Sequence, residues 1–170
     1  MIARGAGLII LLMVCGCAAP GRSITEAFPP GSVAAPWVLQ NDVWAGRLEA
    51  AAPALGDDAA LWREHAPERV WLAVYSHEDA PERCLKVRCF ALSSREVARQ
   101  AFEALRPAGA QPFKYGDVGC WTDMGVLFQW GRLVVEIFGR DASWASQVQS
   151  AMLATFIAKR MPPGLSDNPR

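Results

Sequence analysis

The sequence predicts an α+β domain in which an antiparallel sheet of about five strands carries two amphipathic helices on one face, with a short helix before them. Two observations support this fold class. Segments rich in β-branched and aromatic residues alternate with helical periodicities, in the order helix, two strands, helix, about three strands, helix. Short turns separate neighbouring strands, which is typical of hairpins in an antiparallel sheet.

The N-terminus has the order of an export signal. Arg4 precedes an apolar run, and the run ends in small residues just before Cys17. This order resembles the lipobox of bacterial lipoproteins, in which a diacylglyceryl group is attached to the cysteine and the signal is cut before it. The resemblance covers the N-terminus only. It implies that residues 1–16 are a signal peptide and that Cys17 carries the lipid.

The alternatives to a lipid anchor are an uncleaved membrane helix and a soluble secreted protein. The apolar run, even extended over residues 6–20, is shorter than the roughly 20 residues that a spanning helix needs. We therefore expect a lipid-anchored protein of the cell envelope that faces the periplasm. Ala18 stands where many inner-membrane lipoproteins have aspartate, so the resemblance implies the outer membrane.

The composition excludes some partners. Hydrophobic residues make up 52% and charged residues 20% of the chain, which is typical of a globular protein. Removal of Arg4 leaves 16 basic residues against 17 acidic ones, and no basic run is present. These features argue against a nucleic-acid partner and against electrostatic docking on anionic lipid.

The domain boundaries follow from composition. Residues 17–36 are dominated by Pro, Gly, Ala and Ser, which predicts a flexible tether that follows the lipidated cysteine. Large apolar residues begin at Trp37, so a single domain is expected over residues 37–161. Residues 162–170 begin with two prolines and continue as a polar segment, which predicts a disordered tail.

The first elements of the domain are a short helix and a hairpin. A helix is expected over residues 57–66, because Asp57 and Asp58 suit the first turn and Pro67 disfavours its continuation. Strands over residues 69–75 and 85–92 form the hairpin. The connecting segment SHEDAPER is interpreted as a solvated turn rather than a cation site, since neither histidine has a partner at ligand spacing.

The second half adds two helices and more strands. Ser93 and Glu96 predict a capping box for a helix that extends to residue 106. A bulged strand pair is expected within residues 112–123. Strands 124–130 and 133–139 flank the two-residue turn Gly131-Arg132. The last helix, 142–160, has apolar residues at steps of four, namely Trp144, Val148, Met152 and Phe156.

Cysteine use predicts one disulfide and one free thiol. Cys84, Cys89 and Cys120 remain after the signal and the lipidated residue are set aside, an odd number for an oxidising compartment. Cys89–Cys120 is slightly preferred, and Cys84–Cys89 stays open. Metal and redox sites lack the required spacings, so no metal or other cofactor is expected.

A binding face is expected on the side of the sheet that the two helices leave open. If both helices cover the side of Val126 and Phe128, the opposite side is too apolar to be left to water. The N-terminal segment and the short helix are expected to cover part of it, and substitution of Tyr75 or Gln129 to weaken binding with little loss of stability. The predicted face comprises Trp71, Tyr75, Leu127, Gln129, Glu136 and Phe138.

One family resemblance concerns the domain itself. The segments LGDDAALWREHAPERVWLAVYS, DVGCW and FQWGRLVVEI, with a capped helix between them and a terminal helix after them, resemble a domain-of-unknown-function family of exported bacterial proteins. The resemblance spans residues 55–161 and rests on apolar patterning and glycines. It implies the α+β fold and an exported, often lipidated protein, and it implies no catalytic residues.

The sequence therefore favours a non-catalytic envelope lipoprotein that binds a protein partner or a small ligand. The alternative is a cysteine-dependent enzyme that uses Cys120 with His65 or His77, because a thiol nucleophile needs a nearby base. No spacing in the sequence brings either histidine to Cys120. No catalytic residue is assigned.

Overall fold

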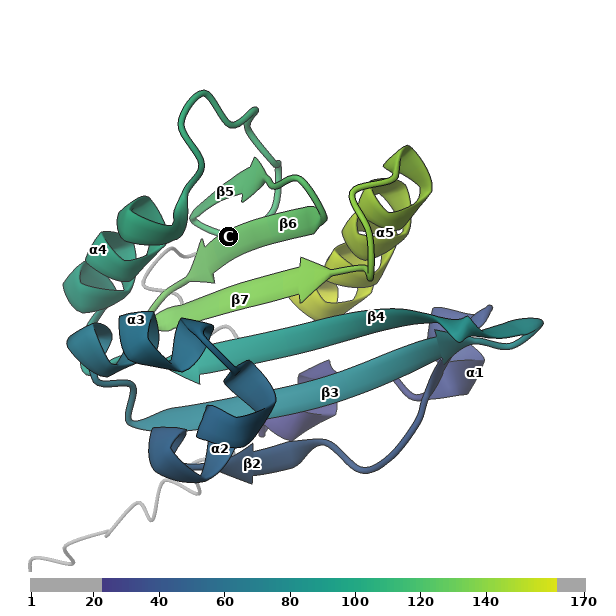
Figure 1. Ribbon diagram of the computed structural model, residues 1–170, viewed down its shortest axis with the longest axis horizontal. Coiled ribbons are helices and arrows are strands. Elements are labelled where there is room, and N and C mark those ends of the chain that lie inside the picture. The colour runs from purple at the N-terminus through teal and green to yellow at the C-terminus, as the bar shows by residue number, and fades with distance from the viewer. Residues whose placement is uncertain (1–22, 162–170) are drawn as a thin grey trace, which may run out of the picture.

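The computed structural model describes residues 23–161 and contains an antiparallel sheet of seven strands over that range (Figure 1). The predicted signal peptide, Cys17 and the tail at 162–170 lie outside the described residues. The sheet order is β1-β3-β4-β7-β6-β5, and β2 pairs with the same edge of β3 as β1 does. The strands are β1 (Trp37–Leu39), β2 (Trp44–Gly46), β3 (Arg69–His77), β4 (Ala80–Ala91), β5 (Val118–Trp121), β6 (Gly125–Trp130) and β7 (Leu133–Phe138).

The α+β class and the antiparallel sheet are confirmed, whereas the expectation of about five strands is too low. The additional strands are β1 and β2, three residues each, which are too short to show an alternating pattern. The helices of the described residues are η1 (Ile24–Ala27), α1 (Gly31–Ala34), α2 (Leu48–Leu55), α3 (Asp58–His65), α4 (Arg95–Leu105) and α5 (Trp144–Arg160).

The prediction that both long helices cover one face is wrong, because they lie on opposite faces of the sheet (Figure 1). Helix α5 packs on the face that carries Phe128 and Val135, which we call the α5 face. Helices α2, α3 and α4 pack on the face that carries Leu127 and Val134, which we call the α4 face. The sheet is thus the middle of three layers, and neither face is left to water as a whole.

The buried side of α5 also differs from the predicted stripe. Trp144 is 77% exposed and Met152 is 49% exposed. The residues that contact the sheet lie three and four positions apart on another side of the helix, and small residues let the helix approach closely. They are Ser150, Leu153, Ala154, Ile157 and Ala158.

Part of the predicted tether belongs to the domain. Residues 23–36 form η1 and α1, and Ala27, Phe28 and Ala34 are buried in the core of the α5 face. The Tyr75 hydroxyl donates a hydrogen bond of 3.0 Å to the Pro29 carbonyl, which fixes this segment to β3. The composition of the segment suggested a linker because only Phe28 offers a large apolar side chain.

One predicted turn is confirmed, and one predicted helix N-cap is wrong by one residue. Strands β6 and β7 pair about the predicted turn at Gly131, whose φ of +56° suits glycine, and Phe128 lies opposite Val135. The N-cap of α4 is Ser94 rather than Ser93, since the Ser94 hydroxyl accepts a hydrogen bond from the Val97 amide. None of the helices within residues 23–161 has the length and apolar character needed to cross a membrane.

Candidate functional site

The six residues of the predicted binding face do not share one surface. Trp71 and Tyr75 lie on the α5 face and are buried in its core. Leu127 and Gln129 lie on the α4 face and are also buried. The prediction failed because it placed β3 relative to β6 without the register through β4 and β7. Glu136 and Phe138 are half-buried, and with Leu127 they line a cleft on the α4 face.

A row of paired residues crosses the sheet at this cleft. Leu72 of β3 lies opposite Arg88 of β4, Arg88 lies opposite Glu136 of β7, and Glu136 lies opposite Leu127 of β6. Directly opposite residues of antiparallel strands are close enough for their side chains to interact. The register therefore places one cation and one anion side by side in a row that otherwise contains leucines.

Arg88 is the centre of the polar contacts in the cleft. Its Nη1 lies 2.6 Å from Asp58 Oδ2 of helix α3 and 3.7 Å from Glu136 Oε2. Its guanidinium also lies over the Phe138 ring, with Cζ 4.7 Å from the ring centroid. The Arg88 side chain is only 11% exposed, whereas that of Asp58 is 57% exposed. The arginine thus links the short helix to the sheet.

Glu136 is the member of this group that has a buried oxygen without a hydrogen-bond donor among residues 23–161. Its Oε2 is buried and accepts no hydrogen bond in the part of the chain that the structure describes. Burial raises the pKa of Glu136 to about 7; the Arg88 charge acts in the opposite direction and Asp58 adds to the rise. The carboxyl group is therefore divided between its charged and neutral forms near neutral pH.

The walls of the cleft are mainly apolar. The cleft has a volume of about 270 Å³. The ion pair lies on the sheet, and the walls come from the end of α4, from the loop that follows it and from the segment between β5 and β6. The apolar residues that line it are Leu105, Pro107, Met124, Val126, Leu127 and Phe138.

This arrangement has the form of a small-molecule binding site. An apolar cleft with a few buried polar groups is the usual form of a small-molecule site. Within residues 23–161, no group of three or more His, Cys, Asp or Glu side chains is placed to hold a metal ion. We call this site, lined by the residues above together with Asp58, Arg88, Thr122, Asp123 and Glu136, the Arg88 cleft.

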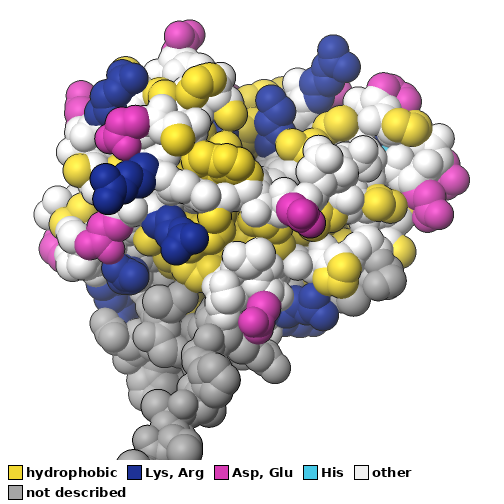
Figure 2. Space-filling view, turned by 90° about the horizontal axis from the view of Figure 1, so that it is seen from below, with side chains coloured by type: hydrophobic (Ala, Val, Ile, Leu, Met, Phe, Trp, Pro, Cys, Tyr) yellow, Lys and Arg dark blue, Asp and Glu magenta, His cyan; other side chains and the backbone are white. Residues whose placement is uncertain are grey.

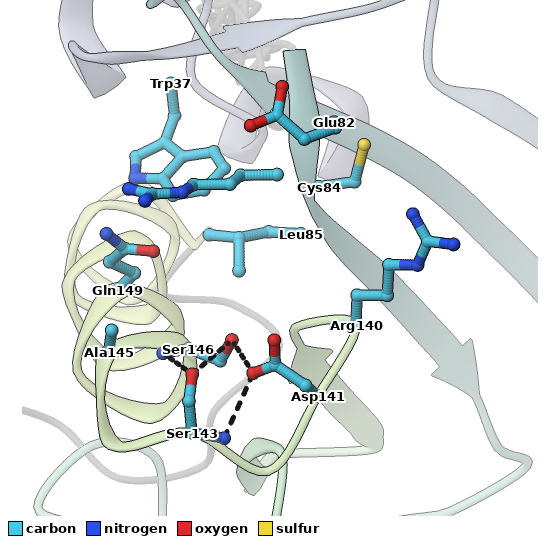
Figure 3. A pocket seen from close by; sticks show the side chains of 11 residues that line it. Trp37, Glu82, Cys84, Leu85, Arg140, Asp141, Ser143, Ala145, Ser146 and Gln149 are labelled. Carbon is cyan, nitrogen blue, oxygen red and sulfur yellow. Dashed lines mark hydrogen bonds between the residues drawn. The ribbon is translucent and has the colours of Figure 1, made fainter. Parts of the chain in front are cut away.

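A second pocket lies between the start of β4 and the start of α5 (Figure 3). Its volume is about 350 Å³. Asp141 accepts hydrogen bonds from the Ser143 amide at 3.0 Å and from the Ser146 hydroxyl at 2.8 Å, and these bonds lower the pKa of Asp141. This carboxylate already has partners at the N-terminus of α5, so we assign it a structural role.

The predicted disulfides are not formed, since Cys84, Cys89 and Cys120 are all free thiols. Cys89 lies on the α5 face and Cys120 on the α4 face. Three strand spacings separate β4 from β5, about 14 Å, which exceeds the roughly 7 Å that a disulfide can bridge. Cys84 is half-buried, and its thiol donates to the Pro81 carbonyl at 3.4 Å.

The burial of the cysteines does not favour the alternative of a cysteine-dependent enzyme. Burial raises the pKa of both Cys89 and Cys120, which lowers the thiolate fraction that a nucleophile requires. The charges that act on Cys120 come from Arg106 and Glu103, not from a histidine. His77 instead lies against the Trp37 ring at the end of β3, with ring centroids 5.4 Å apart.

The surface at the β1 and β2 edge carries charges of both signs (Figure 2). Figure 2 shows Lys and Arg side chains interspersed with Asp and Glu on this side, around hydrophobic side chains near its centre. Val38, Trp44 and Val74 are each 38% exposed. The face in view has no stripe of one charge, which fits the near-neutral composition.

The sequence offered part of the signal for the Arg88 cleft. Glu136 and Phe138 were recognised as polar and aromatic residues on one side of a strand. The local pattern indicates only a strand around Arg88 and a helix start at Asp58. Their meeting depends on the pairing of β4 with β7, which are separated by α4, β5 and β6.

The comparisons with known proteins identify no relative: no family model, no curated protein and no solved structure matches the chain. The resemblance to an exported-protein family stays a prediction.

Proposed function

We propose that this protein is a lipid-anchored protein of the cell envelope whose domain faces the periplasm and binds a small ligand in the Arg88 cleft without catalysis. The anchor is Cys17, and the outer membrane is the proposed location. The membrane is its partner through the lipid, and nucleic acid is not a partner. The proposed cellular location is based on the N-terminal sequence, and the proposed binding role is based on the cleft.

The observation that carries the binding role is the Glu136 carboxylate, buried beside Arg88 in an otherwise apolar cleft. A carboxylate that is buried without its full set of hydrogen bonds costs free energy in the folded protein. A ligand that brings a donor to this carboxyl group would offset part of that cost. A cleft of this size with apolar walls accommodates a small organic molecule.

The anchor is tested by replacing Cys17 with serine. The wild-type protein should be found in the membrane fraction and carry an acyl mass on Cys17, because more than one acyl chain gives stable anchoring. Cys17→Ser should release the protein from the membranes or leave an uncleaved precursor. Fractionation and intact mass spectrometry measure both. A soluble wild-type protein without acyl mass would contradict the proposed anchor.

The binding role is tested with a variant that fills the cleft. Met124 is 41% exposed and lines the cleft, so Met124→Trp should reduce its volume with little effect on the fold. The matched control is Met152→Trp, at a methionine that is 49% exposed on α5. The detergent-solubilised full chain should be screened by thermal shift against small cationic, neutral and anionic molecules.

We expect at least one class to raise the melting temperature of the wild type and of Met152→Trp but not that of Met124→Trp, because a ligand stabilises only the state that binds it. If no class does so, or if Met124→Trp responds like the wild type, the cleft is not the binding site and the proposed function fails.

A further inference from the structure

The charges around the Arg88 cleft are unequal. Three carboxyl groups line it, those of Asp58, Asp123 and Glu136, whereas Arg88 is the single basic residue among its lining residues. The cleft therefore has an excess of negative charge, and this excess is largest when Glu136 is ionised. In a site with apolar walls, such a charge acts more strongly than it would in water.

The guanidinium is not available to an anion. Arg88 already contacts Asp58 at 2.6 Å and Glu136 at 3.7 Å, and the Phe138 ring lies against the guanidinium. An anionic ligand would have to displace one of these carboxylates and would face the others. The same arrangement leaves Glu136 Oε2 without a hydrogen-bond donor among residues 23–161, because the Arg88 guanidinium lies closer to Asp58 than to Glu136.

The apolar walls of the cleft favour a ligand that has an apolar body. Leu105, Pro107 and Met124 form an apolar border on the side of α4 and of the segment before β6. A hydrated metal ion would gain nothing from such walls, whereas an organic cation would bury its carbon chain against them. Charge complementarity and apolar lining together favour one chemical class.

We propose that the Arg88 cleft binds a small primary amine, whose ammonium group contacts the Glu136 carboxylate and whose apolar body contacts the cleft walls. This inference rests on the proposed function and names its ligand class. An ammonium group has three donors and no acceptor, so it supplies what Glu136 lacks. The contact is a charge-assisted hydrogen bond, which is stronger than a neutral one.

Binding of an amine should depend on pH in a defined direction. Four ionisable groups face the bound ammonium: Asp58 from α3, Arg88 from β4, Asp123 from the segment before β6 and Glu136 from β7. Glu136 is the one that titrates near neutrality. The ammonium group binds the ionised carboxylate, so the amine should bind about tenfold more weakly at pH 6 than at pH 8.

The experiment compares three probes of similar shape on the detergent-solubilised full chain. Hexylamine, hexanol and hexanoate differ in the charge of the head group, and their dissociation constants are measured by calorimetry at pH 6 and pH 8. We expect hexylamine to bind at least about tenfold more tightly than either other probe at pH 8. Glu136→Gln should lose this preference and its pH dependence.

The matched control is Glu103→Gln, which removes one carboxylate that pairs with Arg99 on the outer side of α4, and it should bind hexylamine like the wild type. Tighter binding of hexanol or hexanoate in the cleft would overturn the amine inference and leave the proposed function standing. Absence of hexylamine binding, or equal binding to Glu136→Gln, would also overturn it.

Discussion

Replacing Tyr75 with alanine should destabilise the domain by about 3–5 kcal/mol, the range typical of aromatic side chains removed from a core. Tyr75 is fully buried on the α5 face. Its ring packs within the core that α5 and η1 cover, and its hydroxyl donates to the Pro29 carbonyl at 3.0 Å. The substitution would therefore leave a cavity and also release the segment before α1. Denaturant unfolding of the full chain measures the loss.

Tyr75→Phe separates these two contributions. It keeps the ring and removes the hydroxyl, so it should cost only about 1 kcal/mol, the net value of one buried hydrogen bond. An exposed aromatic residue, Trp144→Ala on α5, serves as a comparison and should change stability by less than about 0.5 kcal/mol. A Tyr75→Ala variant as stable as the wild type would contradict the buried position.

The sequence predicts those parts of the fold that depend on local patterns. Elements with strong local patterns were found: the helix at α3, the hairpin of β3 and β4, and the pairing of β6 with β7 about Gly131. Each depends on residues that are close in the chain. The α+β class followed from their order.

The arrangement of these elements in space was not predictable in the same way. Apolar residues point to both faces of the sheet along β6 and β7, so the pattern predicts two buried faces. It does not say which helix covers each face. Helix α5 illustrates the difficulty, because its buried side consists of small and medium residues while Trp144 and Met152 are exposed. Size was a poor guide to burial there.

The candidate site shows the same limit at the level of single residues. Arg88 and Glu136 are 48 positions apart, and only the long-range pairing of β4 with β7 brings them together. A charged pair in a central part of a sheet costs free energy unless the charges are matched. The incomplete pairing of the Glu136 carboxyl group thus arises only in the assembled sheet, and it can be recognised only from the strand register.

Replacing Arg88 with methionine should produce the other main effect, a loss of about 1.4 kcal/mol at pH 8 through Glu136, because the carboxyl group loses its counter-ion and takes up a proton one pH unit above its pKa of about 7. Methionine retains much of the apolar stem of the arginine but removes the guanidinium that lies over the Phe138 ring. The second carboxylate, Asp58, is more than half exposed and should tolerate the loss better.

The pH dependence identifies Glu136 as the cause. The folded pKa of Glu136 is raised from 4.5 to about 7, so its contribution favours folding most below pH 4.5 and is lost as the pH rises to 7, by up to about 3 kcal/mol. Without Arg88 the folded pKa should rise further. The cost of Arg88→Met should then be small at pH 5, where the carboxyl group can keep its proton.

A double-mutant cycle completes the test. Glu136→Gln mimics the neutral carboxyl group and should make the domain more stable than the wild type at pH 8, by about 1–3 kcal/mol. Arg88→Met combined with Glu136→Gln should recover most of the stability that Arg88→Met loses alone, because the uncompensated charge is absent. Unfolding free energies at pH 5 and pH 8 measure this coupling. Equal losses for Arg88→Met at both pH values, with no recovery in the double variant, would show that Arg88 stabilises the domain by packing and not by its charge.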